Sequence, residues 1–256
     1  MKNKKDNNTS WGKVAKWYDE LIENDENYQK DVILPNLLRL MGLDKKDYVL
    51  DVACGQGFFV REFSKISGSV TGVDISKELI GLAKEHSTNN EKYFVSPSHN
   101  LSFLESSSID KISIILALQN IEKTKETLKE FNRVLKDNSK VFLVLNHPSF
   151  RIPKKSDWGF DDDTKTQYRK ISHYMSEQMI KIDMNPGEKD VKKKEYTFSF
   201  HRPLQYYFKI FNECGFKVTR LEEWCSNKTS QVGPRKIAED KARREIPMFM
   251  FIELLK

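Results

Sequence analysis

Cysteine is scarce in this chain, and its positions argue against both a disulfide-stabilised and a metal-stabilised protein. The three cysteines, Cys54, Cys214 and Cys225, are odd in number and show none of the close spacing of a zinc site. They predict neither a disulfide framework nor a metal centre, and free thiols are typical of a reducing compartment. We expect a cytoplasmic protein that holds no metal ion.

Long apolar runs are also absent. Nowhere does an apolar run reach the length of about 18 residues that a membrane-spanning helix needs. The first ten residues are polar and lack the apolar stretch of a secretory signal. The sequence therefore predicts no membrane span. It predicts a mobile tail over residues 1–10, followed by one large domain over residues 11–256.

Basic residues exceed acidic ones, which gives a net charge of +6 and an isoelectric point of about 9.0. Such a balance is found in many nucleic-acid-binding proteins. In this chain, however, the lysines and arginines are interleaved with acidic residues, as on the solvated faces of helices. We therefore expect no nucleic-acid partner, although charge alone leaves an RNA-modifying function open.

A short apolar strand, a turn of small residues and a helix follow one another between residues 48 and 66. This order is typical of the first unit of a nucleotide-binding sheet. Glycine is favoured in such a turn because a Cβ atom would keep the backbone away from the ligand. A dinucleotide fingerprint would need a third glycine where Val60 stands. The motif predicts a different nucleotide-like ligand, or a strand–turn–helix without one.

The turn resembles the Asp/Glu-x-Gly-x-Gly-x-Gly loop of the class I methyltransferases that depend on S-adenosylmethionine (SAM), and in particular their small-molecule, type 11-like branch. Asp51 matches the acidic position, and Gly55 and Gly57 match the second and third glycines. Ala53 replaces the first glycine, and Cys54 lies beside it as a small packing residue. The resemblance implies that SAM is the cofactor and that this loop contacts it.

The same resemblance implies roles for residues outside the loop. Asp74 ends the next strand and would bind the ribose, with Ile75 against adenine; the alternative for Asp74 is a cap of the following helix. Tyr18 belongs to a segment that folds over the cofactor in many similar enzymes, or to a plain amphipathic helix. The 96–103 loop lacks the acid that often contacts adenine. Ser98, or a backbone group, is the candidate in its place.

Residues 109–116 read as the fourth strand, and polar residues follow its carboxyl end. Because ligands of open α/β sheets bind at this edge, we expect Leu116 and Gln119 to contact the cofactor and Asn120 to contact the acceptor. Alternatively, both amides cap the turn into the next helix. Further on, Phe131–Lys136 resembles the Arg-Val-Leu-Lys-Pro-Gly-Gly segment of the family.

The fifth strand, expected over residues 140–145, ends at a second polar cluster that contains His147. Its imidazole is the candidate general base and acceptor contact, since histidine titrates near pH 6.5; the alternative is a loop cap. The α/β alternation then breaks over about residues 149–202, where we expect a lid. Arg151, Trp158 and Tyr174 are its candidate acceptor-binding residues.

Together these patterns predict an α/β fold, with a Rossmann-like, seven-stranded, mostly parallel sheet, helices on both faces and a lid inserted after strand five. The predicted function is transfer of a methyl group from SAM to a small-molecule acceptor. Two alternatives stay open: an RNA or protein methyltransferase, and a SAM-binding subunit without catalysis. A general base is needed only if the acceptor is a hydroxyl group or a protonated amine.

Overall fold

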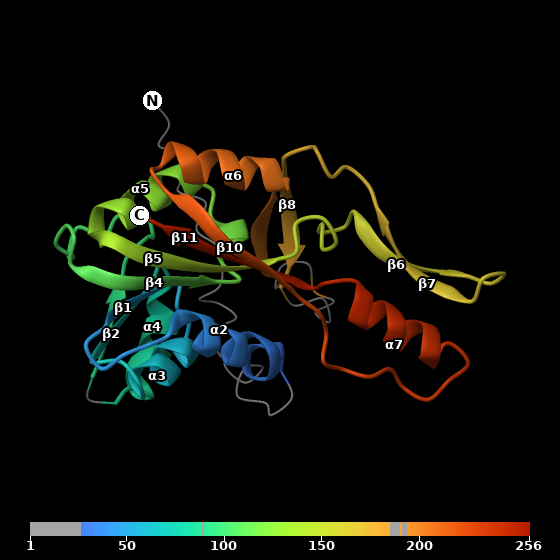
Figure 1. The fold of residues 1–256 in the computed structure, drawn as a ribbon, viewed down its shortest axis with the longest axis horizontal. Helices are drawn as coiled ribbons and strands as arrows, with labels where there is room; N and C mark the ends of the chain where they lie inside the picture. Colours follow the sequence, from blue (N-terminus) through green and yellow to red (C-terminus); the bar gives the residue numbers. More distant parts are fainter. Residues whose placement is uncertain (1–26, 89, 185–189, 191–193) are drawn as a thin grey trace.

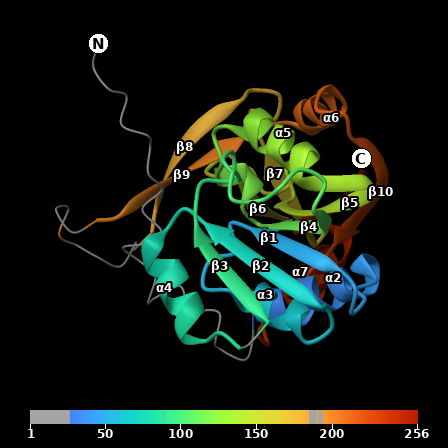
Figure 2. The same cartoon turned by 90° about the vertical axis from the view of Figure 1, so that its left-hand side faces the viewer.

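The structure is a computed structural model that describes residues 27–88, 90–184, 190 and 194–256. Its centre is a seven-stranded sheet in the order β10-β11-β5-β4-β1-β2-β3. The five strands from β5 to β3 are parallel, whereas β11 runs antiparallel to β5 and β10 (Figures 1 and 2). The strands are β1 (Tyr48–Val52), β2 (Ser69–Asp74), β3 (Glu91–Val95), β4 (Ile109–Ile115), β5 (Leu135–Asn146), β10 (Lys217–Trp224) and β11 (Phe249–Leu255). The predicted α/β class is confirmed.

Helices cover both faces of this sheet, and α5 and α6 lie on the face opposite to α2 and α3 (Figure 1). The helical elements are η2 (Gln29–Ile33), α2 (Leu34–Met41), α3 (Phe58–Ser64), α4 (Lys77–Glu85), η3 (Leu118–Asn120), α5 (Thr124–Val134), α6 (Leu204–Glu213) and α7 (Lys236–Glu245). None of the helices in the described ranges is long and apolar enough to cross a membrane.

The central strands read as continuous apolar runs because both of their faces are buried. In β1, Leu50 and Val52 pack in one apolar cluster with α5 and α6, whereas Val49 packs in the other with α2 and α3. Successive side chains of a strand point to opposite faces, so both clusters take residues from the same short run. The sheet is thereby held rigidly, with its carboxyl edge free to carry the site.

The segment between β5 and α6 folds as two β-hairpins, which the sequence pattern did not predict. β6 (Ser156–Asp161) pairs with β7 (Thr166–Ile171), and β8 (Gln178–Asp183) pairs with β9 (Tyr196–His201). The first hairpin lies beside α7 (Figure 1), where the Arg235 guanidinium is 4.3 Å from the ring centroid of Phe160. The second hairpin returns the chain to the sheet, and β9 packs beside η3.

β5 begins five residues earlier than the expected start at residue 140. Leu135 already pairs with Ile109, and the register then shifts before Lys140 pairs with Lys111. Asn138, with φ 60°, lies inside this irregularity. Residues 137–139 therefore form a bulge within the strand, because the flanking residues on both sides pair with β4.

Candidate functional site

A cleft lies at the carboxyl edge of the sheet, beyond the ends of β1, β2 and β4. Asp74 and Ile75 form one wall, the loop after β3 forms another, and the turn after β4 closes the third side. Its lining residues are Ala53, Asp74, Ile75, Ser96, Pro97, Ser98, His99, Asn120, Ile121, Glu122 and Lys123. A connected hollow extends from Asp74 to Gly55 and to Leu116. This is the position at which open α/β sheets bind nucleotides.

The loop after β1 adopts a left-handed backbone at three positions. Ala53 has φ 56°, Gly55 has φ 57° and Gly57 has φ 84°. A Cβ atom on Gly57 would lie 2.7 Å from the hydroxyl oxygen of Tyr93 on β3, which leaves no room for any other residue. The left-handed backbone of Ala53 is strained, as that of glycine would not be, and such strain is concentrated at ligand sites.

The Asp74 carboxylate ties this loop to the next helix. Its Oδ2 atom accepts a hydrogen bond from the Gly55 amide at 3.0 Å, and Oδ1 accepts one from the Ser76 amide at 2.8 Å. Ser76, not Asp74, caps α4, because its hydroxyl accepts from the Leu79 amide at 3.1 Å. Burial raises the pKa of Asp74, and the two amide hydrogen bonds oppose that rise. The carboxylate therefore positions the loop and also lines the cleft.

Asp51 lies in a smaller hollow under the same loop, together with Gln56 and Phe59. Burial raises the pKa of Asp51 to about 7, the hydrogen bond from the Ser113 hydroxyl (2.7 Å) lowers it, and the charge of Asp74 raises it further. Asp51 and Asp74 are two buried carboxylates without an ion pair in the described part of the chain, and such a pair favours a positively charged ligand. The Gln56 side-chain nitrogen is buried there without a hydrogen-bond partner among the described residues, so it can donate to a ligand carboxylate.

This titration predicts a pH dependence of stability in the ligand-free protein. Because the folded pKa of Asp51 lies above its ordinary value of 3.8, its contribution is fully present at low pH and is lost between about pH 4 and about pH 7. Compared with Asp51→Asn, the wild type should lose on the order of 4 kcal/mol over this range. Urea unfolding of both proteins at several pH values measures the difference, and parallel curves would contradict the assignment.

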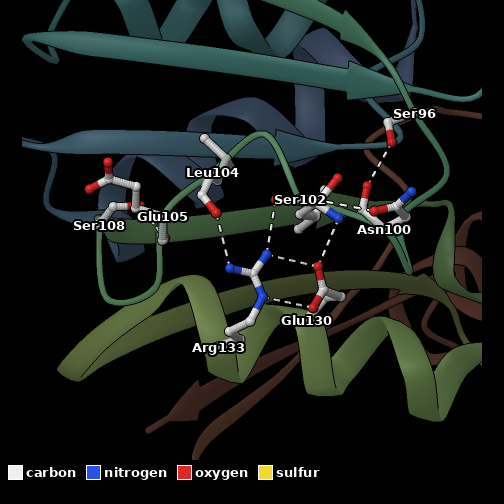
Figure 3. Close-up of polar contacts among 9 residues, drawn as sticks. Ser96, Asn100, Ser102, Leu104, Glu105, Ser108, Glu130 and Arg133 are labelled. Carbon is white, nitrogen blue, oxygen red and sulfur yellow. Dashed lines mark hydrogen bonds and ion pairs between the residues drawn. The ribbon is translucent and has the colours of Figure 1, made fainter.

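The loop after β3 is held against α5 by a clamp of charged side chains (Figure 3). Arg133 donates to the carbonyl oxygens of Leu104 and Leu101, at 2.9 Å each, and to both carboxylate oxygens of Glu130, at 2.8 and 2.9 Å. Glu130 in turn accepts from the Leu101 amide at 2.8 Å. Arg133 belongs to the family-like segment at residues 131–136. The clamp shows why an arginine is needed there, since its fork reaches four acceptor atoms.

Removing the clamp should loosen one wall of the cleft. Arg133→Met removes the guanidinium hydrogen bonds to the Leu101 and Leu104 carbonyls and to the Glu130 carboxylate, so we expect about 2–3 kcal/mol lower stability and weaker SAM binding. Lys125→Met is the matched control on α5, because it breaks only the exposed ion pair with Glu213. Thermal unfolding and calorimetric SAM titration report both effects. Equal stability of the two variants would show that the clamp is dispensable.

The serines of this loop already have partners. The Ser98 hydroxyl is 2.9 Å from the hydroxyl of Thr127, and the Ser96 hydroxyl donates to the Asn100 carbonyl at 2.6 Å (Figure 3). Both serines nevertheless line the cleft. Ile75 lies opposite, and 43% of its surface is exposed, which is unusual for isoleucine and leaves an apolar face for a planar ring.

The turn after β4 separates two hollows. Leu116, with φ 53°, presents its carbonyl oxygen to the side-chain amides of Gln119 (2.7 Å) and Asn120 (3.4 Å). Asn120 and Leu116 line the cleft beside Asp74, whereas Gln119 lines a separate pocket. The structure thus places Asn120, and not Gln119, next to Asp74, because neighbouring residues of the short helix η3 point in different directions.

The separate pocket lies between η3, the end of β5 and the end of β9. It includes Arg151, predicted from the sequence, and Arg202, which was not. Its lining residues are Gln119, Asn146, Pro148, Arg151, Pro153, Ser199, Phe200, His201, Arg202 and Tyr207. No spacing signal marked Arg202, since it follows the inserted hairpins and reaches the site only through the pairing of β8 with β9.

His147 lines none of these hollows. It is buried, with 2% of its surface exposed; its Nε2 atom lies 2.6 Å from a Glu223 carboxylate oxygen, and Nδ1 accepts from the Ser149 amide at 3.2 Å. Burial lowers the pKa of His147, and the hydrogen bond to Glu223 raises it. Because both ring nitrogens are engaged within the fold, this geometry disagrees with the role of general base and fits that of a cap at the end of β5.

The remaining predicted residues lie elsewhere or outside the described ranges. Trp158 is on β6, where the Arg169 guanidinium is 5.0 Å from its ring centroid. The Tyr174 hydroxyl accepts from the Leu204 amide at 3.0 Å, so this side chain supports the start of α6. Neither residue lines the hollows given above. Tyr18 lies outside the described residues.

Comparisons with known proteins agree with this geometry. Residues 50–143 match a family described as a methyltransferase domain. A demethylmenaquinone methyltransferase of Staphylococcus aureus is 33% identical over 148 residues, which make up 56% of this chain and 61% of the relative. The chain thus spans about three fifths of the length of the curated relatives that it matches.

Two solved structures share the fold over most of both chains. A SAM-dependent methyltransferase from Mesorhizobium loti aligns with a TM-score of 0.68 and 18% identity, covering 87% of this chain and 96% of that one. A putative SAM-dependent methyltransferase from Listeria monocytogenes aligns with a TM-score of 0.65 and 21% identity, covering 86% and 96%.

The strand order, the glycine loop and the cleft at the carboxyl edge define a nucleotide-binding α/β domain of the methyltransferase type. Residues 50–143 carry a methyltransferase domain, and the whole described chain has the fold of SAM-dependent methyltransferases.

Proposed function

We propose that the protein transfers the methyl group of SAM to a small-molecule acceptor. One observation carries this proposal: adjacent residues of η3 line two different hollows, with Asn120 in the cleft of Asp74 and Gln119 in the pocket of Arg151. A cofactor in the first hollow and an acceptor in the second would meet across this short helix. The arrangement suits a reaction in which two bound molecules react directly.

The residues of the cleft, together with those of the smaller hollow under the glycine loop, fit SAM group by group. Asp74 offers carboxylate oxygens for the ribose hydroxyls, Ile75 an apolar surface for adenine, and Asp51 a negative charge for the ammonium group. Gln56 adds the unpaired donor described above. Bound SAM supplies a methyl group whose bond to sulfur breaks as the acceptor's electron pair forms the new bond, leaving a neutral thioether and releasing any acceptor proton to solvent.

Positioning is the main contribution that these residues make to rate. The histidine that lines the second pocket, His201, has its Nε2 atom 2.7 Å from the Tyr174 carbonyl oxygen, and His147 lies outside the pockets described above. Proximity and orientation alone can supply a large part of the barrier reduction in a methyl transfer. We therefore propose orientation of the acceptor by the second pocket as the catalytic principle.

We propose only that the acceptor is a small molecule, which is less specific than the name of the relative. The Staphylococcus aureus relative is named for a quinone precursor, but the similarity covers only 148 residues. We carry over a small molecule as acceptor and not the quinone. A reducing, cytoplasmic location is part of the proposal, supported by three cysteines that are all free.

Mass spectrometry of a metabolite extract tests the proposal. The protein is incubated with the extract and with SAM that carries an isotope-labelled methyl group, and the expected result is one labelled small molecule that depends on the protein. Calorimetry is expected to show binding of SAM and none of NAD. Tight SAM binding without any labelled product would favour the non-catalytic subunit, and label in RNA or protein would reverse the acceptor class.

A further inference from the structure

The second pocket contains a buried positive charge that has no counter-ion among the described residues. Only 5% of the Arg202 surface is exposed. Its Nη2 atom donates to the carbonyl oxygens of Ile121 (2.9 Å) and Glu122 (3.2 Å), and its guanidinium lies 5.0 Å from the ring centroid of Phe200. Its Nη1 atom is buried and has no hydrogen-bond partner among the described residues. One side of the fork is thus held by the fold, and the other makes no hydrogen bond within the described residues.

A second arginine lines the same pocket. Arg151 follows β5 by five residues, and burial lowers the pKa of its guanidinium. Within the described ranges, no carboxylate lies within ion-pair distance of Arg151 or Arg202. Uncompensated charges are costly to bury, and proteins that bury them commonly use them to bind an opposite charge.

The pocket also presents one free acceptor atom and flat walls. The Gln119 side-chain nitrogen donates to the Leu116 carbonyl, which leaves its buried Oε1 without a partner in the described part of the chain. Phe200 and Tyr207 contribute aromatic walls. Burial raises the pKa of Tyr207 to about 12, although the neighbouring Arg202 opposes the rise, so this phenol stays neutral. A ligand here needs a negative group, a hydrogen-bond donor and a flat apolar part.

We propose that Arg202 and Arg151 bind an anionic oxygen group of the methyl acceptor, a carboxylate or a phosphate, while a hydroxyl or N–H group of the same molecule donates to Gln119. This inference rests on the proposed function, because it names the acceptor class of that reaction. An arginine fork matches the planar oxygens of such groups, and the side already bound to two backbone carbonyls is pre-oriented. Acceptors without a negative charge would leave both guanidinium groups unpaired, so they are selected against.

Probe binding tests this site without knowledge of the true acceptor. The full chain is titrated calorimetrically with benzoate, with its neutral counterpart benzamide and with inorganic phosphate, at constant ionic strength. We expect saturable binding of one anion, and no binding of benzamide. Arg151→Gln should weaken the anion about tenfold or more, as expected for a charged hydrogen bond. Arg220→Gln, which changes an exposed arginine on β10, should leave it unchanged.

Each outcome decides the question. Benzoate binding alone assigns a carboxylate, and phosphate binding alone assigns a phosphate. Equal binding of benzoate and benzamide, or anion binding insensitive to Arg151→Gln, would overturn the proposal. If Arg202→Gln folds, its anion affinity should also be reduced. If it does not fold, the anion affinity of Arg151→Gln alone decides. SAM affinity is measured on the same samples. If the protein binds the anion but not SAM, the proposed function is wrong and the anion site stands. If it binds SAM but no anion, the anion site is wrong and the proposed function stands.

Discussion

Replacing Asp74 by alanine is expected to weaken SAM binding by about tenfold to a hundredfold. The carboxylate does two things at once. It accepts from the Gly55 and Ser76 amides, and it lines the cleft. Alanine leaves the buried Gly55 amide without an acceptor, so the glycine loop keeps only the hydrogen bond from the Cys54 amide to the Val73 carbonyl as its attachment to β2. It also removes the acceptor that we propose for the ribose hydroxyls of SAM. Calorimetric titration of folded Asp74→Ala with SAM measures the change.

Two control variants distinguish the role of Asp74 in SAM binding from a role as a helix cap. Asp74→Asn keeps one acceptor oxygen and removes the charge, so an intermediate SAM affinity is expected. Ser76→Ala removes the cap that accepts from the Leu79 amide, and it should cost about 1 kcal/mol of stability. Because Ser76 does not line the cleft, its SAM affinity should stay at the wild-type value. Equal SAM affinities of Asp74→Ala and wild type would restrict Asp74 to a purely structural role.

Gly57→Ala is expected to lower the free energy of unfolding by about 2–5 kcal/mol. Two independent causes add up. Alanine at φ 84° pays the cost of a left-handed backbone, and its Cβ atom would lie 2.7 Å from the Tyr93 hydroxyl. Tyr93 has little freedom to move, since its hydroxyl donates to Glu91 at 3.1 Å. Urea unfolding monitored by circular dichroism gives the change directly.

A matched glycine in the same domain provides the control. Gly81 lies inside α4 with open space around the site of its Cβ atom, so Gly81→Ala should stabilise the protein by about 0.5–1 kcal/mol. The double variant Gly57→Ala/Tyr93→Leu should be less destabilised than the sum of its single changes, because the steric part disappears and the backbone part stays. Strict additivity would show that the Tyr93 contact plays no part.

Local features of this chain could be predicted because their causes are local. The apolar runs of β1 and β4 are imposed by burial on both faces, and the helical spacing after Gly57 follows from the core-facing side of α3. Asp51, Gly55, Gly57 and Asp74 are close together in space because they follow directly on two neighbouring parallel strands. Gly215, with φ 84°, ends α6 at the position that its sequence indicates.

The acceptor side could not be predicted in this way, because contacts distant in the sequence decide it. His147 is paired with Glu223, 76 positions away, only because β11 lies between their strands and Met248 accepts from the His147 amide. A sequence shows that a histidine follows a strand, but not which way its ring turns or what fills its two nitrogens.

The division between Gln119 and Asn120 has the same origin. Both amides look equivalent in the sequence, yet the single turn of η3 directs one toward Asp74 and the other toward Arg151. The glycine loop and its strands were thus determined by the sequence itself, through backbone sterics and strand periodicity, and SAM as cofactor followed from the resemblance of this loop to a family motif. The identity of the acceptor pocket, and above all the arrival of Arg202 from beyond two hairpins, was decided only by the tertiary structure, because strand pairing and packing bring together residues that no local pattern relates.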